Sequence, residues 1–178
     1  TSKYDLSAGA PSLVAGRGTV RPGDGIGDRA WRDWNDERDR LWEIRRAASG
    51  GSERYLPPQL HDEAYALEEN GRWEYVPYGG SSYHLWRPVS VHAGWTPFTA
   101  GRWTLWYGDH CWIPDEPFGY VTHHYGTWVY IDSRRCWYWA PPLVAVVAGH
   151  PFGLPCVWYP GRVAWIYSDL YVGWIPLM

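Results

Sequence analysis

Three segments in the C-terminal two-thirds of the chain open on a glycine two residues before a tryptophan and close on a Trp-x-Pro triplet. The openings are Gly71-Arg72-Trp73, Gly101-Arg102-Trp103 and Gly126-Thr127-Trp128, and the closings are Trp86-Arg87-Pro88, Trp112-Ile113-Pro114 and Trp139-Ala140-Pro141. Turn-forming residues lie between each opening and its closing. Proline ends a strand because it has no N–H for the ladder. The repeats therefore predict one antiparallel β-hairpin per segment.

A fourth, degenerate repeat runs through Trp158, Trp165, Tyr171 and Trp174 and closes on Trp174-Ile175-Pro176. A lone hairpin is marginally stable in water, so the units must stack or merge. We expect a mainly β fold with N-terminal helices, in which repeated antiparallel β-hairpins form one sheet or barrel, preceded by an extended arm. The tryptophans expected to hold this repeat are Trp73, Trp86, Trp103, Trp112, Trp128, Trp139 and Trp174.

The chain divides by composition into three parts. Residues 1–27 are rich in glycine and proline without a sustained period and are expected to form the arm. Residues 28–70 are expected to be helical, with one helix over 28–49 between Asp28 and Gly50, and a second over 58–69. Residues 71–178 form the predicted hairpin domain.

The first predicted helix carries a broad aromatic and aliphatic face that includes Trp31, Trp34 and Trp42. This face either packs on the chain's own sheet or binds a partner. Tryptophan, tyrosine and arginine are enriched at binding hot spots. The candidate partner contacts are Trp31, Trp34, Trp42, Trp95, Arg72 and Arg102.

The composition favours contact surfaces over chemistry. The chain has 15 Trp and 14 Tyr against 3 Phe, so nearly all of its large rings carry a polar atom, which suits small β cores, interfaces and ligand platforms. A net charge of −3 argues against nucleic acid as a partner. The longest apolar run, residues 143–148, is far shorter than the roughly 20 residues of a membrane span, so we expect no transmembrane span.

The two ends and the cysteines bear on the compartment. The chain starts at Thr1 and its only methionine is Met178, which fits the removal of an initiator and a signal peptide. Its three cysteines, Cys111, Cys136 and Cys156, allow at most one disulfide, whose pairing the sequence leaves open. We expect Cys111 and Cys136 to occupy equivalent places in their repeats, too far apart in a simple meander to bond.

Several longer motifs resemble a known family. They are Leu56-Pro57-Pro58, Asn70 to Pro77, Gly94 to Phe98, Asp115 to Gly119, His124 to Tyr130 and Tyr171 to Leu177. Over residues 55–178 the chain resembles the YXWV-motif proteins, an uncharacterised, Trp-rich, secreted bacterial family. The resemblance implies export, a β-rich fold and no established activity or catalytic residues. Thr127 departs from it, because the other two openings carry arginine.

Three groups of residues are candidates for chemistry. His123-His124, with His110, Asp109 and Asp115, could suggest a metal site, but neighbours on a strand point to opposite faces, so one histidine is expected among aromatics and the other in solvent. Asp115-Glu116 could serve glycoside hydrolysis, although a polar turn explains the pair more simply. Cys111 beside His110 lacks an orienting partner for a nucleophile. We expect no catalytic, cofactor or metal site.

These observations favour a non-enzymatic extracytoplasmic scaffold or docking protein, periplasmic or extracellular. We expect an accessory subunit that fastens onto a larger envelope or membrane-associated assembly through protein partners. Two alternatives stay open: a carbohydrate- or peptidoglycan-binding module using exposed Trp and Tyr, and a structural subunit of a surface filament or matrix. A glycan platform needs several exposed tryptophan rings in a row, whereas a docking subunit buries them against protein.

Overall fold

The computed structural model describes residues 12–15, 19–22, 29–142, 145–147, 150–152 and 156–177, and the chain forms two compact units, 1–43 and 44–178. In the first unit, β1 (Ser12–Ala15) pairs antiparallel with β2 (Thr19–Pro22), and most of α1 (Arg29–Ala48) follows. The rest of the expected arm lies outside the described residues. Helix α1 matches the helix expected over 28–49 to within one residue at each end.

A short helical segment leads from α1 into the sheets of the second unit. It comprises η1 (Ser49–Gly51), η2 (Glu53–Tyr55), η3 (Pro58–Glu63) and α2 (Ala64–Asn70). The helix expected over 58–69 is thus divided into a 3₁₀ part and an α part. The Leu60 N–H donates to Pro57 O, the three-residue spacing of a 3₁₀ turn. Ala64, Ala66 and Leu67 of α2 are buried in the core.

Four antiparallel hairpins follow. They are β3 (Gly71–Tyr78) with β4 (Ser81–Pro88), β5 (Gly101–Trp106) with β6 (Asp109–Pro114), β7 (Thr127–Ile131) with β8 (Cys136–Ala140), and β11 (Val163–Tyr167) with β12 (Val172–Pro176). In each hairpin the opening tryptophan lies directly opposite the closing one: Trp73 opposite Trp86, Trp103 opposite Trp112, Trp128 opposite Trp139 and Trp165 opposite Trp174. The predicted hairpins are confirmed. In the fourth, Val163 stands where an opening glycine is expected.

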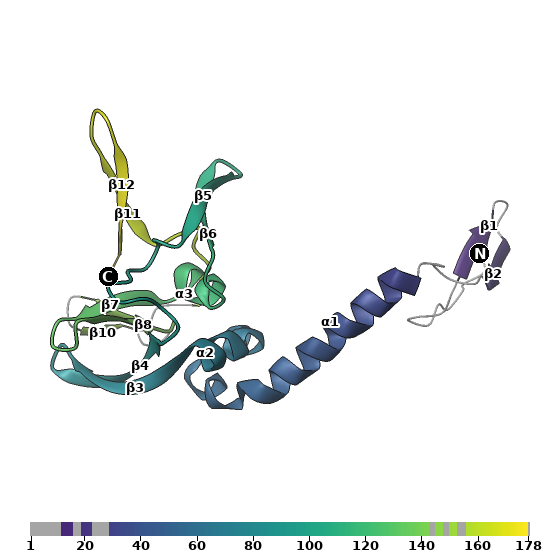
Figure 1. Ribbon diagram of the computed structural model, residues 1–178, viewed down its shortest axis with the longest axis horizontal. Coiled ribbons are helices and arrows are strands. Elements are labelled where there is room, and N and C mark those ends of the chain that lie inside the picture. The colour runs from purple at the N-terminus through teal and green to yellow at the C-terminus, as the bar shows by residue number, and fades with distance from the viewer. Residues whose placement is uncertain are drawn as a thin grey trace. The chain divides into compact units, whose positions relative to one another are not determined.

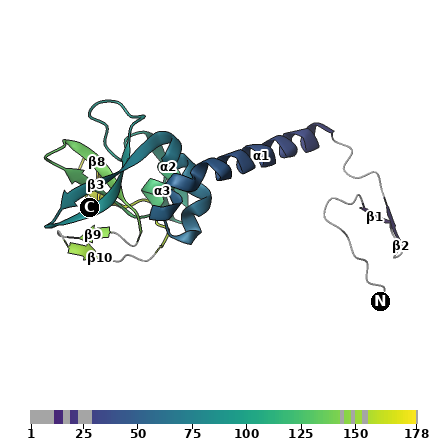
Figure 2. The ribbon, with the colours of Figure 1, turned by 90° about the horizontal axis from the view of Figure 1, so that it is seen from below.

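The hairpins join into one sheet only in part. Strands β3, β4, β8 and β7 form a four-stranded sheet in the order β3-β4-β8-β7, joined where Trp86 of β4 pairs with Trp139 of β8. The second and fourth hairpins stay as separate two-stranded sheets, as does β9 (Ala145–Val147) with β10 (His150–Phe152). None of the described sheets closes into a barrel. Helices α2 and α3 (Gly119–His124) lie close to the four-stranded sheet (Figure 1, Figure 2).

The paired tryptophans form the centre of the core. Trp86, Trp112, Trp128 and Trp139 are each at most 1% exposed. Their rings meet neighbouring rings at steep angles, as aromatic side chains prefer. The Trp86 indole N–H donates to Leu67 O at 2.9 Å, and that of Trp139 donates to Tyr125 O at 2.8 Å. The tryptophans therefore fix both the packing and the backbone around the sheet.

The opening glycines are needed because the closing tryptophan packs against them. A Cβ at Gly71 would lie 2.3 Å from the Trp86 ring, and one at Gly101 would lie 2.6 Å from the Trp112 ring. At Gly126 it would lie 2.8 Å from Trp139 Nε1. Real side chains never approach so closely, so only glycine fits. The Gly-x-Trp motif thus records a close approach between the opening backbone and the closing ring.

Helix α3 corrects one expectation. Residues 123–124 were expected on a strand, with one histidine solvated, but Gly119–His124 form a short helix and both His123 and His124 are buried. Phe118 and Val121 anchor this segment in the same core as Trp86. A helix of this length has little periodic signal of its own, and packing determines it.

Candidate functional site

Two hairpins end in exposed apolar and aromatic side chains. We call these the β5–β6 tip, formed by Leu105, Trp106 and Tyr107, and the β11–β12 tip, formed by Ile166, Tyr167, Leu170, Tyr171 and Val172. Tyr107 is 94% exposed and Leu170 is 83% exposed. Single exposed apolar residues are ordinary, but groups of this kind mark interaction sites.

The bases of these two hairpins are joined. The rings of Trp103 on β5 and Trp165 on β11 lie 4.6 Å apart. The backbone N–H of Trp112 in β6 donates to Pro160 O, just before β11, at 2.8 Å. Both hairpins extend from the same side of the four-stranded sheet (Figure 1). The tips are therefore carried by strands whose bases are held in the aromatic core.

An aromatic groove lies beside the β5–β6 hairpin. It has a volume of about 560 Å³, and Trp106, Tyr120 and Trp158 contribute partly exposed rings to its lining. His124 lies under Trp158, with the two rings stacked 5.0 Å apart. The groove has the size of a small-ligand site. Partly exposed rings are also the side chains on which sugar rings stack.

Glu116 is the only acidic side chain among the described residues that line this groove. The Trp95 indole N–H donates to Glu116 Oε1 at 3.0 Å, and burial raises the pKa of this carboxyl. Its neighbour Asp115 is exposed and does not line the groove. Two-carboxylate hydrolysis needs both acids at one bond. The pair is arranged as a turn anchored to Trp95.

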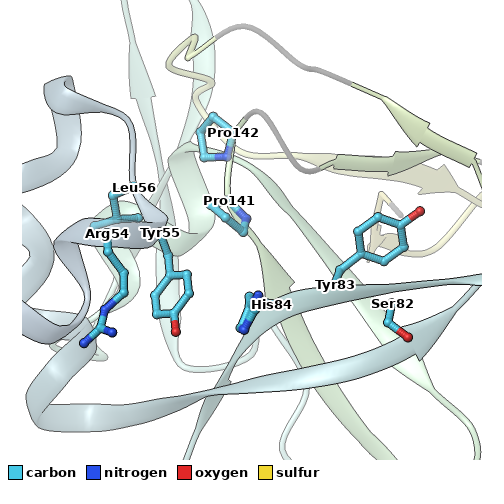
Figure 3. A pocket seen from close by; sticks show the side chains of 8 residues that line it. All are labelled: Arg54, Tyr55, Leu56, Ser82, Tyr83, His84, Pro141 and Pro142. Atoms are coloured by element: carbon cyan, nitrogen blue, oxygen red, sulfur yellow. The ribbon is translucent and has the colours of Figure 1, made fainter.

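A second hollow, of about 400 Å³, lies between η2, β4 and the end of β8. Tyr55 stacks on Trp73 at 4.5 Å and on His84 at 5.0 Å. Figure 3 shows Tyr55 and His84 next to each other, with Pro141 and Pro142 also lining the hollow. The Tyr55 ring stacks on Trp73, which is half-buried, so this hollow belongs mainly to the packing of the first hairpin.

His123 is held as a neutral imidazole inside the core. The Phe98 N–H donates to His123 Nε2 at 3.1 Å, so Nε2 is an acceptor and the ring proton lies on Nδ1, which donates to Gly119 O at 3.1 Å. Burial lowers the pKa of His123 to about 3. His124 Nδ1 faces Tyr159 O at 2.6 Å, and burial lowers its pKa too. Both histidines are structural ties between α3 and neighbouring loops.

Comparison with known proteins places this architecture in a family. A model described as a family of unknown function, DUF6600, matches residues 64–178, more than half of the chain. The chain belongs to the DUF6600 family. No curated protein and no solved structure matches it. The DUF6600 region contains α2, all four tryptophan hairpins and both tips, so the family match and the hairpin repeat cover the same part of the molecule.

The buried histidines of the DUF6600 region predict a loss of stability in mild acid. The pKa of His123 in the folded state lies below its ordinary value of 6.5, so the unfolded chain binds more protons. The stability that neutral His123 contributes is fully present above about pH 6.5. It falls as the pH drops toward 3, by up to about 1.4 kcal/mol per pH unit in the free energy of unfolding. Urea unfolding at pH 7 and pH 5 measures this slope.

A matched pair of variants tests the assignment to His123. His123→Gln keeps one acceptor and one donor without titrating, and should reduce the slope between pH 7 and pH 5, leaving the part that His124 contributes. His92→Gln, at an exposed loop position, should leave the slope as it is. An unchanged slope in His123→Gln would contradict the assignment.

The three cysteines of the DUF6600 region are free thiols. Burial raises the pKa of Cys111 and Cys156, which disfavours the reactive thiolate. Cys111 and Cys136 do not occupy equivalent places as expected. Cys111 pairs with Thr104 one position from its tryptophan pair, whereas Cys136 pairs with Ile131 three positions from its own. The tryptophan that follows Cys136 is Trp137, whereas the closing tryptophan of this hairpin is Trp139.

The residues expected to contact partners are in different environments. Trp31, Trp34 and Trp42 are about half exposed on α1, whereas Trp95 is buried and belongs to the core. Arg72 is exposed and lines a pocket together with Trp95, while Arg102 is exposed on β5. Sequence reasoning missed the two tips because Leu105, Tyr107 and Leu170 belong to no repeated motif.

The described part of the chain contains no cluster of three or more His, Cys, Asp or Glu side chains that could hold a metal ion. Its helices include none long and apolar enough to cross a membrane.

Proposed function

We propose that the protein is a non-enzymatic docking module of the cell envelope, periplasmic or extracellular, which serves as an accessory subunit of a larger membrane-associated assembly. The observation that carries this proposal is the pair of exposed apolar tips on β5–β6 and β11–β12. Tyrosine and tryptophan anchors with an apolar body and a polar atom are the side chains that dominate binding energy at interfaces.

The rigid base of each tip supports docking. Tips carried on a packed aromatic core lose little conformational freedom when they bind, which keeps the entropic cost of association low. Trp103 and Trp165 link the two hairpins at their bases. The two tips can therefore act as parts of one contact surface.

Export is supported by the resemblance to the secreted YXWV-motif proteins. The thiols are compatible with it, because Cys111 is buried and burial raises its pKa. A protonated, buried thiol reacts slowly with oxidants and disulfides, so Cys111 can stay free in an oxidising compartment.

The tips can be tested without disturbing the core. Tyr107→Asp combined with Leu170→Asp places charges on two side chains that are almost fully exposed. We expect retention of the purified chain on washed envelope fractions to fall at least about ten-fold, the effect of roughly 1.4 kcal/mol, with an unchanged melting temperature. The measurement is co-sedimentation, with circular dichroism as the fold check.

Tyr75→Asp is the matched control, because Tyr75 is an exposed tyrosine on β3, away from both tips. It should bind as the wild-type chain does. Equal retention of the double variant and the control would show that the tips do not dock.

Glycan binding is the second candidate, favoured by the groove that Trp106, Tyr120 and Trp158 line. The same experiment separates the two functions. The double tip variant keeps Trp106, Tyr120 and Trp158, although it removes the Tyr107 ring that lies 5.4 Å from the Trp106 ring. Retention that survives the tip changes but is competed by soluble peptidoglycan fragments would favour glycan binding.

A further inference from the structure

A third pocket, of about 540 Å³, brings together three arginines from two strands of the four-stranded sheet and from one of its turns. Arg72 of β3, Arg87 of β4 and Arg135 from the turn before β8 all line it. The segment 89–95 and Trp137 of β8 complete the lining. The protein as a whole carries a net charge of −3, so this is a local concentration of positive charge on an acidic molecule.

The strand register forces two of these charges together. Arg72 lies directly opposite Arg87 in the β3–β4 ladder. Like charges at directly opposite positions destabilise a sheet. Such an arrangement is tolerated when an anion compensates it.

The nearby carboxylate does not compensate all three arginines. Glu74 Oε1 accepts from Arg87 Nε at 2.8 Å. Its other oxygen, Oε2, accepts from Arg134 and from the Tyr138 hydroxyl. Both oxygens of Glu74 are thus engaged, and Arg72 and Arg135 have no carboxylate partner among the described residues.

The backbone at Arg135 is held in a strained conformation. Its φ of 51° lies in the left-handed region, which costs a non-glycine residue roughly 1–2 kcal/mol. The same region is occupied by Gly79 and Gly80 in the first hairpin turn, and by Tyr107 and Gly108 in the second. In the third hairpin the residue in this region is Arg135, which also lines the pocket. Strained residues of this kind cluster at ligand sites.

We propose that this pocket binds the anionic group, a carboxylate or a phosphate, of a small ligand through Arg72 and Arg135. Guanidinium groups match both anions with paired N–H donors. The flanking Val89, Val91 and Trp137 offer apolar contacts to the body of the ligand. This site is separate from the tips, and goes beyond the proposed docking function.

The experiment is calorimetric titration of the full chain with glucuronate and inorganic phosphate, using glucose as the neutral match to glucuronate. We expect saturable binding of at least one of the two anions, weakened by added salt, and no binding of glucose. Arg72→Gln and Arg135→Gly should each weaken anion binding roughly ten-fold, in line with the loss of one charge-assisted contact.

Two comparisons distinguish a binding role from a structural one. Arg135→Gly relieves the positive φ as it removes the guanidinium, so its melting temperature should be equal to or above the wild-type value while binding falls. Arg102→Gln is the matched control, because Arg102 occupies the same repeat position on β5 but lies opposite Ile113, and it should bind anions as the wild-type chain does.

The proposal fails on any of three results. These are no saturable binding of either anion by the wild-type chain, binding of glucose as tight as that of glucuronate, and a loss of anion binding in Arg102→Gln equal to that in Arg72→Gln.

Discussion

Trp139→Ala is expected to lower the free energy of unfolding by about 3–5 kcal/mol, the range for removing a fully buried large aromatic side chain. Trp139 is 0% exposed and pairs with Trp128 in its own hairpin and with Trp86 across the β4–β8 join. Its indole N–H also satisfies Tyr125 O. The substitution would therefore leave a cavity at the Trp86–Trp139 pair, where the first and third hairpins join into a sheet.

Urea unfolding at neutral pH measures this loss, and two further variants divide it. Trp139→Phe keeps most of the ring but leaves Tyr125 O without its donor, which should cost about 1–3 kcal/mol. Trp106→Ala removes a tryptophan that is 61% exposed and should change stability by no more than about 0.5 kcal/mol. Equal losses for Trp139→Ala and Trp106→Ala would contradict the core assignment.

Gly126→Ala is the second large effect, with an expected loss of about 2–4 kcal/mol from a strained φ together with overpacking. Gly126 has a φ of 62°. A Cβ there would lie 2.2 Å from Ala140 O and 2.8 Å from Trp139 Nε1. Ala140 belongs to strand β8, which is paired with β7. The clash with its carbonyl oxygen can therefore be relieved only if the third hairpin itself shifts.

Gly94→Ala separates the two causes. Gly94 also has a positive φ, 78°, but a Cβ there meets nothing within 4 Å. It should lose only the conformational part, about 1 kcal/mol, as measured by the same urea unfolding. If the two variants lose equal stability, the close contact between the opening glycine and the closing tryptophan contributes nothing.

The hairpins were predictable from sequence because their determinants are local. A glycine, a tryptophan, a turn and a Trp-x-Pro closing lie within one short segment, and the tryptophans face each other as soon as the turn forms. Trp165 was harder to recognise as an opening residue, because Val163 replaces the glycine. The pattern still placed its partner, Trp174.

The parts that sequence reasoning missed depend on distant contacts. Helix α3 forms where Phe118 and Val121 pack beside Trp86, and six residues carry no helical period to show it. The arginine pocket needs β4 and β8 to pair before Arg72 and Arg135 can line one space. Sequence spacing does not show that Arg72 and Arg135 lie near each other in the fold, and so Arg135 could not be singled out from the sequence.

In each hairpin the tryptophan pair is separated from the turn, so the two parts can vary independently within the family. Each hairpin keeps its ring pair at the base, whereas the connecting residues differ: 79–80, 107–108, 132–135 and 168–171. Insertions or replacements at these ends leave the ring pairs in place. The molecule thus resembles a framework with replaceable loops, in which relatives could retain the aromatic base while exchanging the ends to suit different partners.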